Sequence, residues 1–85
     1  MSDYQILRET ITKLIDFPNT EWCITQLSAD HCFEHLDKYE VEGRVTPKFF
    51  IEDRGVTLVW REGNLKTYHH FYPDEKEDEI FRTRT

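Results

Sequence analysis

The sequence predicts a small single α+β domain in which an antiparallel meander sheet of three to four strands is packed by two helices. Apolar residues recur at helical spacing within 3–16 and again within 28–42. A third stretch, 45–72, is rich in aromatic and β-branched residues and is divided by two short glycine-containing turns, a pattern typical of β-hairpins. With one short strand between the helices, the predicted order is α-β-α-β-β-β, and a length of 85 residues allows one core.

The first helix is expected over residues 3–16. Ser2 or Asp3 can cap its N-terminus, and Pro18 lies just past its end, where proline commonly follows a helix. The apolar face is formed by Tyr4, Leu7, Ile11, Leu14 and Ile15. The segment that follows, TEWCITQL at 20–27, is rich in residues that favour a pleated surface, so it predicts a short strand.

The second helix is expected to begin at a Ser28 cap and to stop at Gly43. Its apolar stripe is formed by Cys32, Phe33, Leu36 and Tyr39. At about 100° per residue, three acids fall on the side away from this stripe: Asp30, Glu34 and Asp37. The second helix therefore predicts an exposed acidic row.

Three strands are expected at 45–52, 56–61 and 65–72, joined by turns at 53–55 and 62–64. Because side chains alternate along a strand, one face carries Phe49, Ile51, Val56, Leu58 and Trp60, and the other carries Phe50, Val59, Tyr68 and Tyr72. Two helices can hardly cover both faces of the sheet in so short a chain. We expect the second face to be an apolar docking surface, unless lysine and arginine stems cover its rings.

Charge is distributed unevenly along the chain. The formal net charge is −6, and the stretches 28–42 and 74–79 each hold five acids against one lysine, whereas 43–72 is net positive by two. The last stretch, 74–85, has the composition of a loosely ordered acidic C-terminal tail. Such a tail can be no more than a solubilising end, or it can be part of a binding surface.

The two acidic stretches predict a non-catalytic domain that binds a protein. Spaced carboxylates can imitate phosphates and steer association with a basic groove. We therefore expect an inhibitor or an immunity or antidefence-type protein, which blocks a basic nucleic-acid-handling enzyme. The expected partner-binding residues are Asp30, Glu34, Asp37, Phe50, Tyr68, Tyr72, Glu75, Asp78 and Glu79.

Two other binding functions are alternatives to this one. Rings and cations on one sheet face (Lys48, Phe50, Arg61, Lys66, Tyr68 and Tyr72) could bind single-stranded nucleic acid, but the chain is acidic overall. His31 and His35 lie one helical turn apart and could bind zinc, with Cys32, His69 and His70 as conceivable further ligands. The pair is not part of an HExxH motif and is expected to be solvated or to flank the helix. The prediction is therefore no metal and no cofactor, with His31 and His35 as weak candidates.

Catalysis is not expected, because the chain has no glycine-rich phosphate loop and no nucleophile elbow, and adjacent His69 and His70 should point to opposite sides of a strand. The two cysteines, Cys23 and Cys32, form no CxxC pair and predict reduced thiols. The N-terminus lacks a signal peptide, and no run of about 18 apolar residues occurs. We expect a cytoplasmic protein, or one acting in a host cell's cytoplasm if a virus or mobile element encodes it. No membrane or direct nucleic-acid partner is expected.

Overall fold

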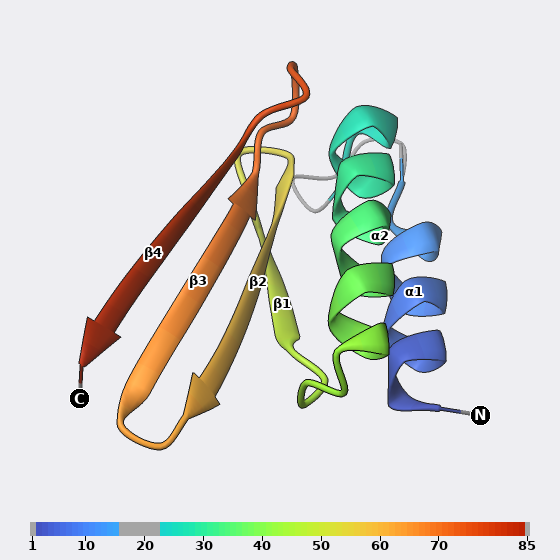
Figure 1. The fold of residues 1–85 in the computed structure, drawn as a ribbon. Helices are drawn as coiled ribbons and strands as arrows, with labels where there is room; N and C mark the ends of the chain where they lie inside the picture. The colour runs from blue at the N-terminus through green and yellow to red at the C-terminus, as the bar shows by residue number, and fades with distance from the viewer. Residues whose placement is uncertain (1, 16–22, 85) are drawn as a thin grey trace.

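The computed structural model describes residues 2–15 and 23–84. Two helices and four strands follow one another in the order α-α-β-β-β-β: α1 (Asp3–Lys13), α2 (Gln26–Val41), β1 (Lys48–Glu52), β2 (Gly55–Glu62), β3 (Leu65–Phe71) and β4 (Asp78–Arg84). The strands form an antiparallel sheet in the order β1-β2-β3-β4. Both helices lie on one side of this sheet (Figure 1). The predicted α+β class and the meander are confirmed.

The first helix begins as the sequence predicts. The Ser2 side chain caps α1 by accepting a hydrogen bond from the backbone N–H of Gln5 at 3.1 Å. Tyr4, Leu7 and Ile11 are buried, because the three- and four-residue spacing turns them all toward α2 and the sheet. The helix ends at Lys13, a little before the predicted end at residue 16.

The strand predicted at 20–27 is wrong over its described part, 23–27. Ile24 forms only an isolated bridge with Ile15, and α2 already begins at Gln26. The Thr25 hydroxyl caps this helix by accepting a hydrogen bond from the N–H of Ser28 at 3.2 Å, so Ser28 is not the cap. Local β-propensity is a weak preference, and here a capping side chain and the burial of Ile24 outweigh it. The remainder of the predicted strand lies outside the described residues.

The end of the chain also differs from its prediction. Residues 78–84, expected in a loose tail, form β4 and pair along β3 from Phe71↔Asp78 to Leu65↔Arg84. This segment contains Ile80, Phe81 and Thr83, residue types that favour strands, and β3 offers it an unpaired edge that a chain returning through a turn can fill. The predicted element order therefore lacked its last strand.

The core lies between α2 and the helix-facing side of the sheet. Val56, Leu58 and Trp60 are buried there as predicted, and the ring of Phe71 is fully enclosed. Their partners on α2 are Ala29, Cys32, Leu36 and Tyr39. None of the helices in the described part of the chain is long and apolar enough to cross a membrane.

Candidate functional site

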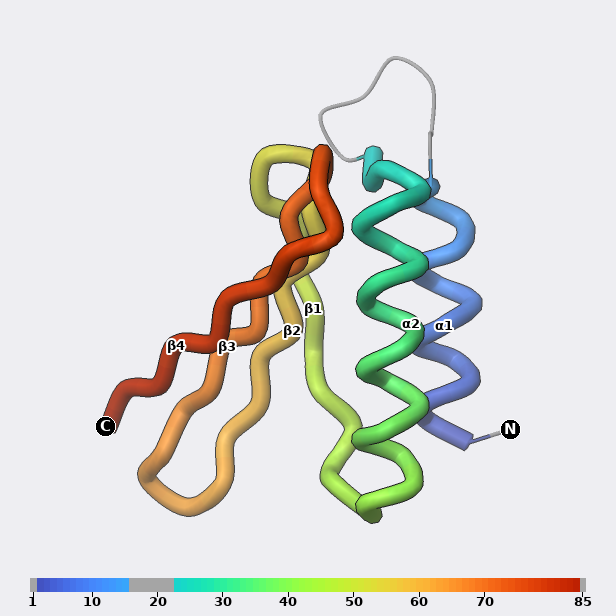
Figure 2. The backbone as a smooth tube through the Cα atoms, turned by 45° about the horizontal axis from the view of Figure 1, so that its top comes forward, coloured from blue at the N-terminus to red at the C-terminus, as the bar shows by residue number. Residues whose placement is uncertain are grey.

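The two acidic stretches of the sequence meet at one end of the molecule. The Nζ atom of Lys76 lies 3.2 Å from Oε1 of Glu34, and the Thr25 hydroxyl donates a hydrogen bond to the carbonyl oxygen of Pro73 at 2.7 Å. These contacts hold the β3–β4 turn beside the first half of α2, as Figure 2 shows. We use the name acidic end for the exposed carboxylates of this region: Asp30, Glu34, Asp74, Glu75 and Glu77.

The predicted acidic row on α2 is confirmed as exposed, but its members have different surroundings. Asp37 accepts a hydrogen bond from the guanidinium of Arg8 at 2.7 Å, and the same group contacts Glu40 at 2.8 Å. These two acids thus serve the contact between α1 and α2. Asp30, by contrast, accepts a neutral hydrogen bond from the side-chain amide of Gln26, one turn earlier on the same helix.

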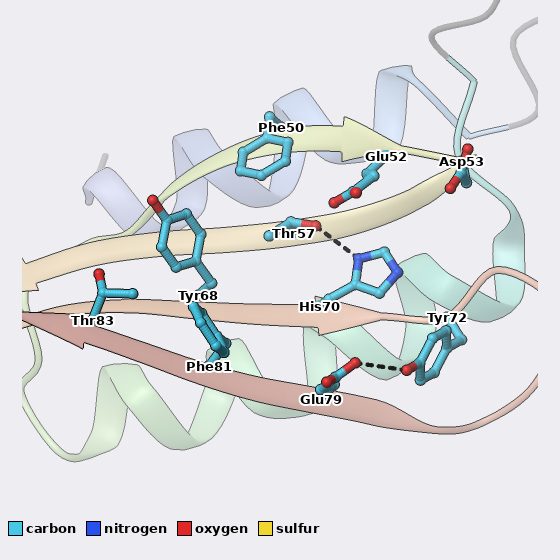
Figure 3. Close-up of a pocket in the computed structure, with 10 residues that line it drawn as sticks. All are labelled: Phe50, Glu52, Asp53, Thr57, Tyr68, His70, Tyr72, Glu79, Phe81 and Thr83. Carbon is cyan, nitrogen blue, oxygen red and sulfur yellow. Dashed lines mark hydrogen bonds between the residues drawn. The ribbon is translucent and has the colours of Figure 1, made fainter.

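The sheet face turned away from the helices forms a second surface, which we call the open face. It carries Phe50, Tyr68, Tyr72 and Phe81 (Figure 3), and the residues Phe50 and Phe81 are 42% and 59% exposed. The hydroxyl of Tyr72 donates to Oε2 of Glu79 at 2.8 Å. The predicted side-chain alternation is confirmed here, and both helices leave this face uncovered.

Charge varies along the open face. Cations occupy one end of it, since Arg61 pairs with Lys66 across the strands and the Nζ of Lys66 lies 5.2 Å from the centre of the Tyr68 ring. Glu52 and Glu79 lie toward the other end, beside a groove that the rings share. The open face therefore has positive charge at one end and negative charge at the other, whereas nearly all charges of the acidic end are negative.

The predicted partner-binding residues do not form one patch. Asp30, Glu34 and Asp37 are exposed on α2 and Glu75 lies in the β3–β4 turn, whereas Phe50, Tyr68, Tyr72 and Glu79 lie on the open face. The pairing of Phe71 with Asp78 turns the Asp78 side chain to the helix-facing side of the sheet. Alternation along 78–84 could have shown this separation, had that segment been recognised as a strand.

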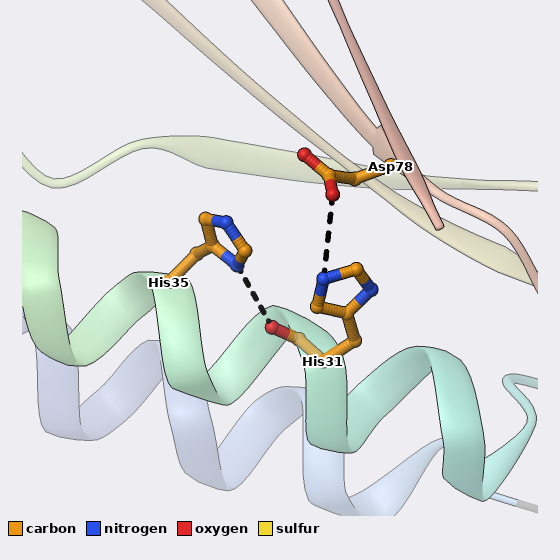
Figure 4. Close-up of side chains that lie close together, drawn as sticks. All are labelled: His31, His35 and Asp78. Atoms are coloured by element: carbon orange, nitrogen blue, oxygen red, sulfur yellow. Dashed lines mark hydrogen bonds and ion pairs between the residues drawn. The ribbon is translucent and has the colours of Figure 1, made fainter. Parts of the chain in front are cut away.

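A cluster of histidines surrounds Asp78. Its carboxylate oxygens lie 2.7 Å from Nε2 of His69 and 3.4 Å from Nε2 of His31. Ligand atoms of His31, His35 and Asp78 all lie within 4.8 Å of one another (Figure 4). The expectation of a solvated histidine pair is therefore wrong: His31 is only 6% exposed, and both rings pack against Phe71.

Hydrogen bonds fix the protonation of part of this cluster. Burial raises the pKa of Tyr39 to about 12, so its hydroxyl is a donor, and it lies 2.6 Å from Nδ1 of His69. Burial lowers the pKa of His69 more than the Asp78 carboxylate raises it. Burial tends to raise the pKa of Asp78, but the hydrogen bond and charge interaction with His69 outweigh it and leave that pKa below its ordinary value. His69 is thus neutral and donates from Nε2 to an ionised Asp78.

The other conceivable ligands stay outside the cluster. His70 lies on the open face, with Nδ1 2.8 Å from the Thr57 hydroxyl, so the two adjacent histidines point to opposite sides as predicted. Cys32 is fully buried in the apolar stripe, and burial raises the pKa of its thiol. Both cysteines are free thiols.

No protein-family model, curated protein or solved structure matches this chain. Three features of the described residues bear on its function: the acidic end, the open face and the histidine cluster.

Proposed function

We propose that this chain is a non-catalytic protein-binding domain that docks its acidic end on a basic nucleic-acid-handling enzyme and blocks it. One observation carries the proposal: the contact of Lys76 with Glu34 joins two acidic stretches that lie about 40 residues apart in the sequence. The resulting carboxylates come from α2 and from the β3–β4 turn that lies beside it. A basic groove built for phosphates would meet several negative charges at once.

The acidic end keeps most of its charge available. Both partners of the Lys76 contact are more than half exposed, with side-chain exposures of 63% and 55%. A pair this exposed adds little to stability, so its residues are free to exchange partners. Asp37 and Glu40 instead form ion pairs with Arg8. They are therefore less available to a partner than Asp30 and Glu34.

The test compares two triple variants with the same change in net charge. One neutralises the acidic end with Asp30→Asn, Glu34→Gln and Glu75→Gln. The matched control changes exposed acids elsewhere, and it consists of Glu9→Gln, Glu52→Gln and Asp53→Asn. Because exposed charges contribute little to folding, both variants should melt near the wild-type temperature.

Immobilised wild type, variant and control are then incubated with host lysate at low and at high salt. We expect the wild type and the control to retain the same basic protein, which DNA or RNA displaces, and the acidic-end variant to lose it. Retention should weaken as salt rises, because the Debye length falls from about 10 Å at 0.1 M to about 3 Å at 1 M. The purified partner should lose activity on nucleic acid when wild type is added.

Equal retention by the acidic-end variant would contradict the proposal. So would a gel shift in which the purified domain itself binds single-stranded RNA or DNA and needs Lys66 and Tyr68, since this result would favour nucleic-acid binding on the open face.

A further inference from the structure

The histidine cluster joins ligand-type side chains from two distant parts of the chain. His31 and His35 lie one turn apart on the sheet-facing side of α2, and Asp78 opens β4. We propose that His31, His35 and Asp78 bind a borderline divalent transition metal, with Zn²⁺ the best fit. Two imidazoles and one carboxylate are a common zinc ligand set, and they leave one position for water or another ligand.

The distances suit such a site. Zinc bonds of about 2.0–2.2 Å in a tetrahedron place ligand atoms roughly 3.3–3.6 Å apart. The 3.4 Å between Nε2 of His31 and Oδ1 of Asp78 already has this value, and all three ligand atoms lie within 4.8 Å of one another. His35 and Asp78 are partly exposed, so small side-chain rotations can close the remaining gap.

Neighbouring groups orient the ligands as they do around known metal sites. The Nδ1 atom of His35 lies 3.2 Å from the backbone oxygen of His31, so this nitrogen is the donor and Nε2 keeps its lone pair for a metal. His69 donates to Oδ2 of Asp78, and Tyr39 donates to His69, so the carboxylate is held ionised with Oδ1 turned to His31. Tyr39 and His69 are positioning residues, because they act on the metal through Asp78.

The polar atoms of the cluster are not all satisfied by the described part of the chain. Nδ1 of His31 is buried and has no hydrogen-bond partner there. A metal bound at Nε2 would not give this nitrogen a partner, because the two nitrogens lie on opposite sides of the ring, so Nδ1 would carry the proton in the metal-bound form.

A metal bound to this cluster would also hold the turn of the acidic end beside α2. It would link α2 directly to the first residue of β4, just after the turn that carries Asp74, Glu75 and Glu77. The site is distinct from the acidic carboxylates that the proposed partner would contact, so metal binding can be measured without that partner.

The experiment is a Co²⁺ titration of the chelator-treated full chain, followed by its visible absorption, with displacement by Zn²⁺ to measure zinc affinity. Co²⁺ reports its ligand geometry, so a four-coordinate site should give intense visible bands that saturate at one equivalent. The ligand variants are His35→Gln and Asp78→Asn. The control is His70→Gln, which removes the chain's histidine from the open face.

We expect wild type and the control to bind alike and each ligand variant to lose at least tenfold in affinity. His69→Gln should weaken binding by about 10- to 100-fold, the typical effect of removing a group that orients a ligand. Circular dichroism of the metal-free proteins shows whether a variant folds, and a variant that does not fold is replaced by His35→Ala. Absence of saturable visible bands in wild type would overturn the proposal. Equal affinities across ligand variants and control would overturn it as well, since they would indicate loose binding to surface acids.

Discussion

Ser28 links three elements of the fold through one hydroxyl group. It is fully buried in α2, where its Oγ donates to the carbonyl oxygen of Phe71 at 3.0 Å and accepts from the N–H of Val56 at 3.0 Å. The first bond reaches β3 and the second reaches β2. Replacement by alanine keeps the helix but removes both bonds.

The cost of Ser28→Ala follows from the two backbone groups that lose this partner. A buried donor or acceptor left unsatisfied costs about 1–3 kcal/mol, so the pair costs about 2–6 kcal/mol. Alanine favours the helix interior over serine by about 0.5 kcal/mol, which offsets a little of this. We expect the free energy of unfolding to fall by about 2–5 kcal/mol, out of a total of about 4–13 kcal/mol for a chain of this length.

The matched control is Ser2→Ala, the same replacement at the chain's other serine. Ser2 is exposed, and its hydroxyl accepts the capping hydrogen bond from Gln5 and donates to Glu40 at 3.5 Å, so its loss should cost about 1 kcal/mol. Urea unfolding followed by circular dichroism measures both variants. If Ser28→Ala costs no more than Ser2→Ala, the buried hydroxyl does not hold the helix to the sheet and the reasoning is refuted.

Four further results are expected. Trp60→Ala should cost about 3–5 kcal/mol in urea unfolding, because the ring is 7% exposed in the core. Phe50→Ser on the open face should cost far less by the same measurement. Gly55→Ala should cost at least about 1–3 kcal/mol, because an added Cβ would collide with a backbone carbonyl of β3 that cannot move aside. In metal-free buffer, stability should fall in two steps as the pH is lowered. The folded-state pKa of His69 is lowered, so the contribution of His69 to folding stability is complete above its unfolded pKa of about 6.5 and is lost as the pH falls below that value. The folded-state pKa of Asp78 is also lowered, so the contribution of Asp78 to folding stability is lost below about pH 4.

Each of these expectations has its own check. If Trp60→Ala and Phe50→Ser lowered the free energy of unfolding equally, both faces of the sheet would belong to the core. For the glycine, Gly43→Ala is the comparison, because an added Cβ there meets nothing within 4 Å and only the positive φ of 74° is strained. The first pH step is measured in wild type between pH 7.5 and 5. A stability that stays flat over that interval in wild type would rule out a depressed pKa at His69.

The sequence by itself determined the elements whose signals are local. The Ser2 cap and the three- and four-residue spacing of Tyr4, Leu7 and Ile11 fix α1. The sequence predicted a hairpin turn at 53–55, and in the structure its two central residues are Asp53 and Arg54, both with positive φ, which fits the register of β1 on β2. Once register is set, alternation assigns each side chain to a face.

Tertiary structure decided the features that depend on contacts between distant residues. Thr25 begins α2 where strand propensity was high, because Ile24 is buried and the Thr25 hydroxyl caps the helix. Residues 78–84 become β4 because β3 offers an edge, a property of the assembled sheet and not of the segment alone.

The candidate sites depend on the same long-range contacts. His31 and His35 were visible as a pair in the sequence, but only the pairing of β4 with β3 brings Asp78 to them. The acidic end likewise exists because the β3–β4 turn lies beside α2, where Thr25 bonds Pro73 and Lys76 meets Glu34. Local periodicity fixes which way a side chain points, whereas the neighbour it meets is set by packing over long sequence separations, and a single sequence carries little signal for that.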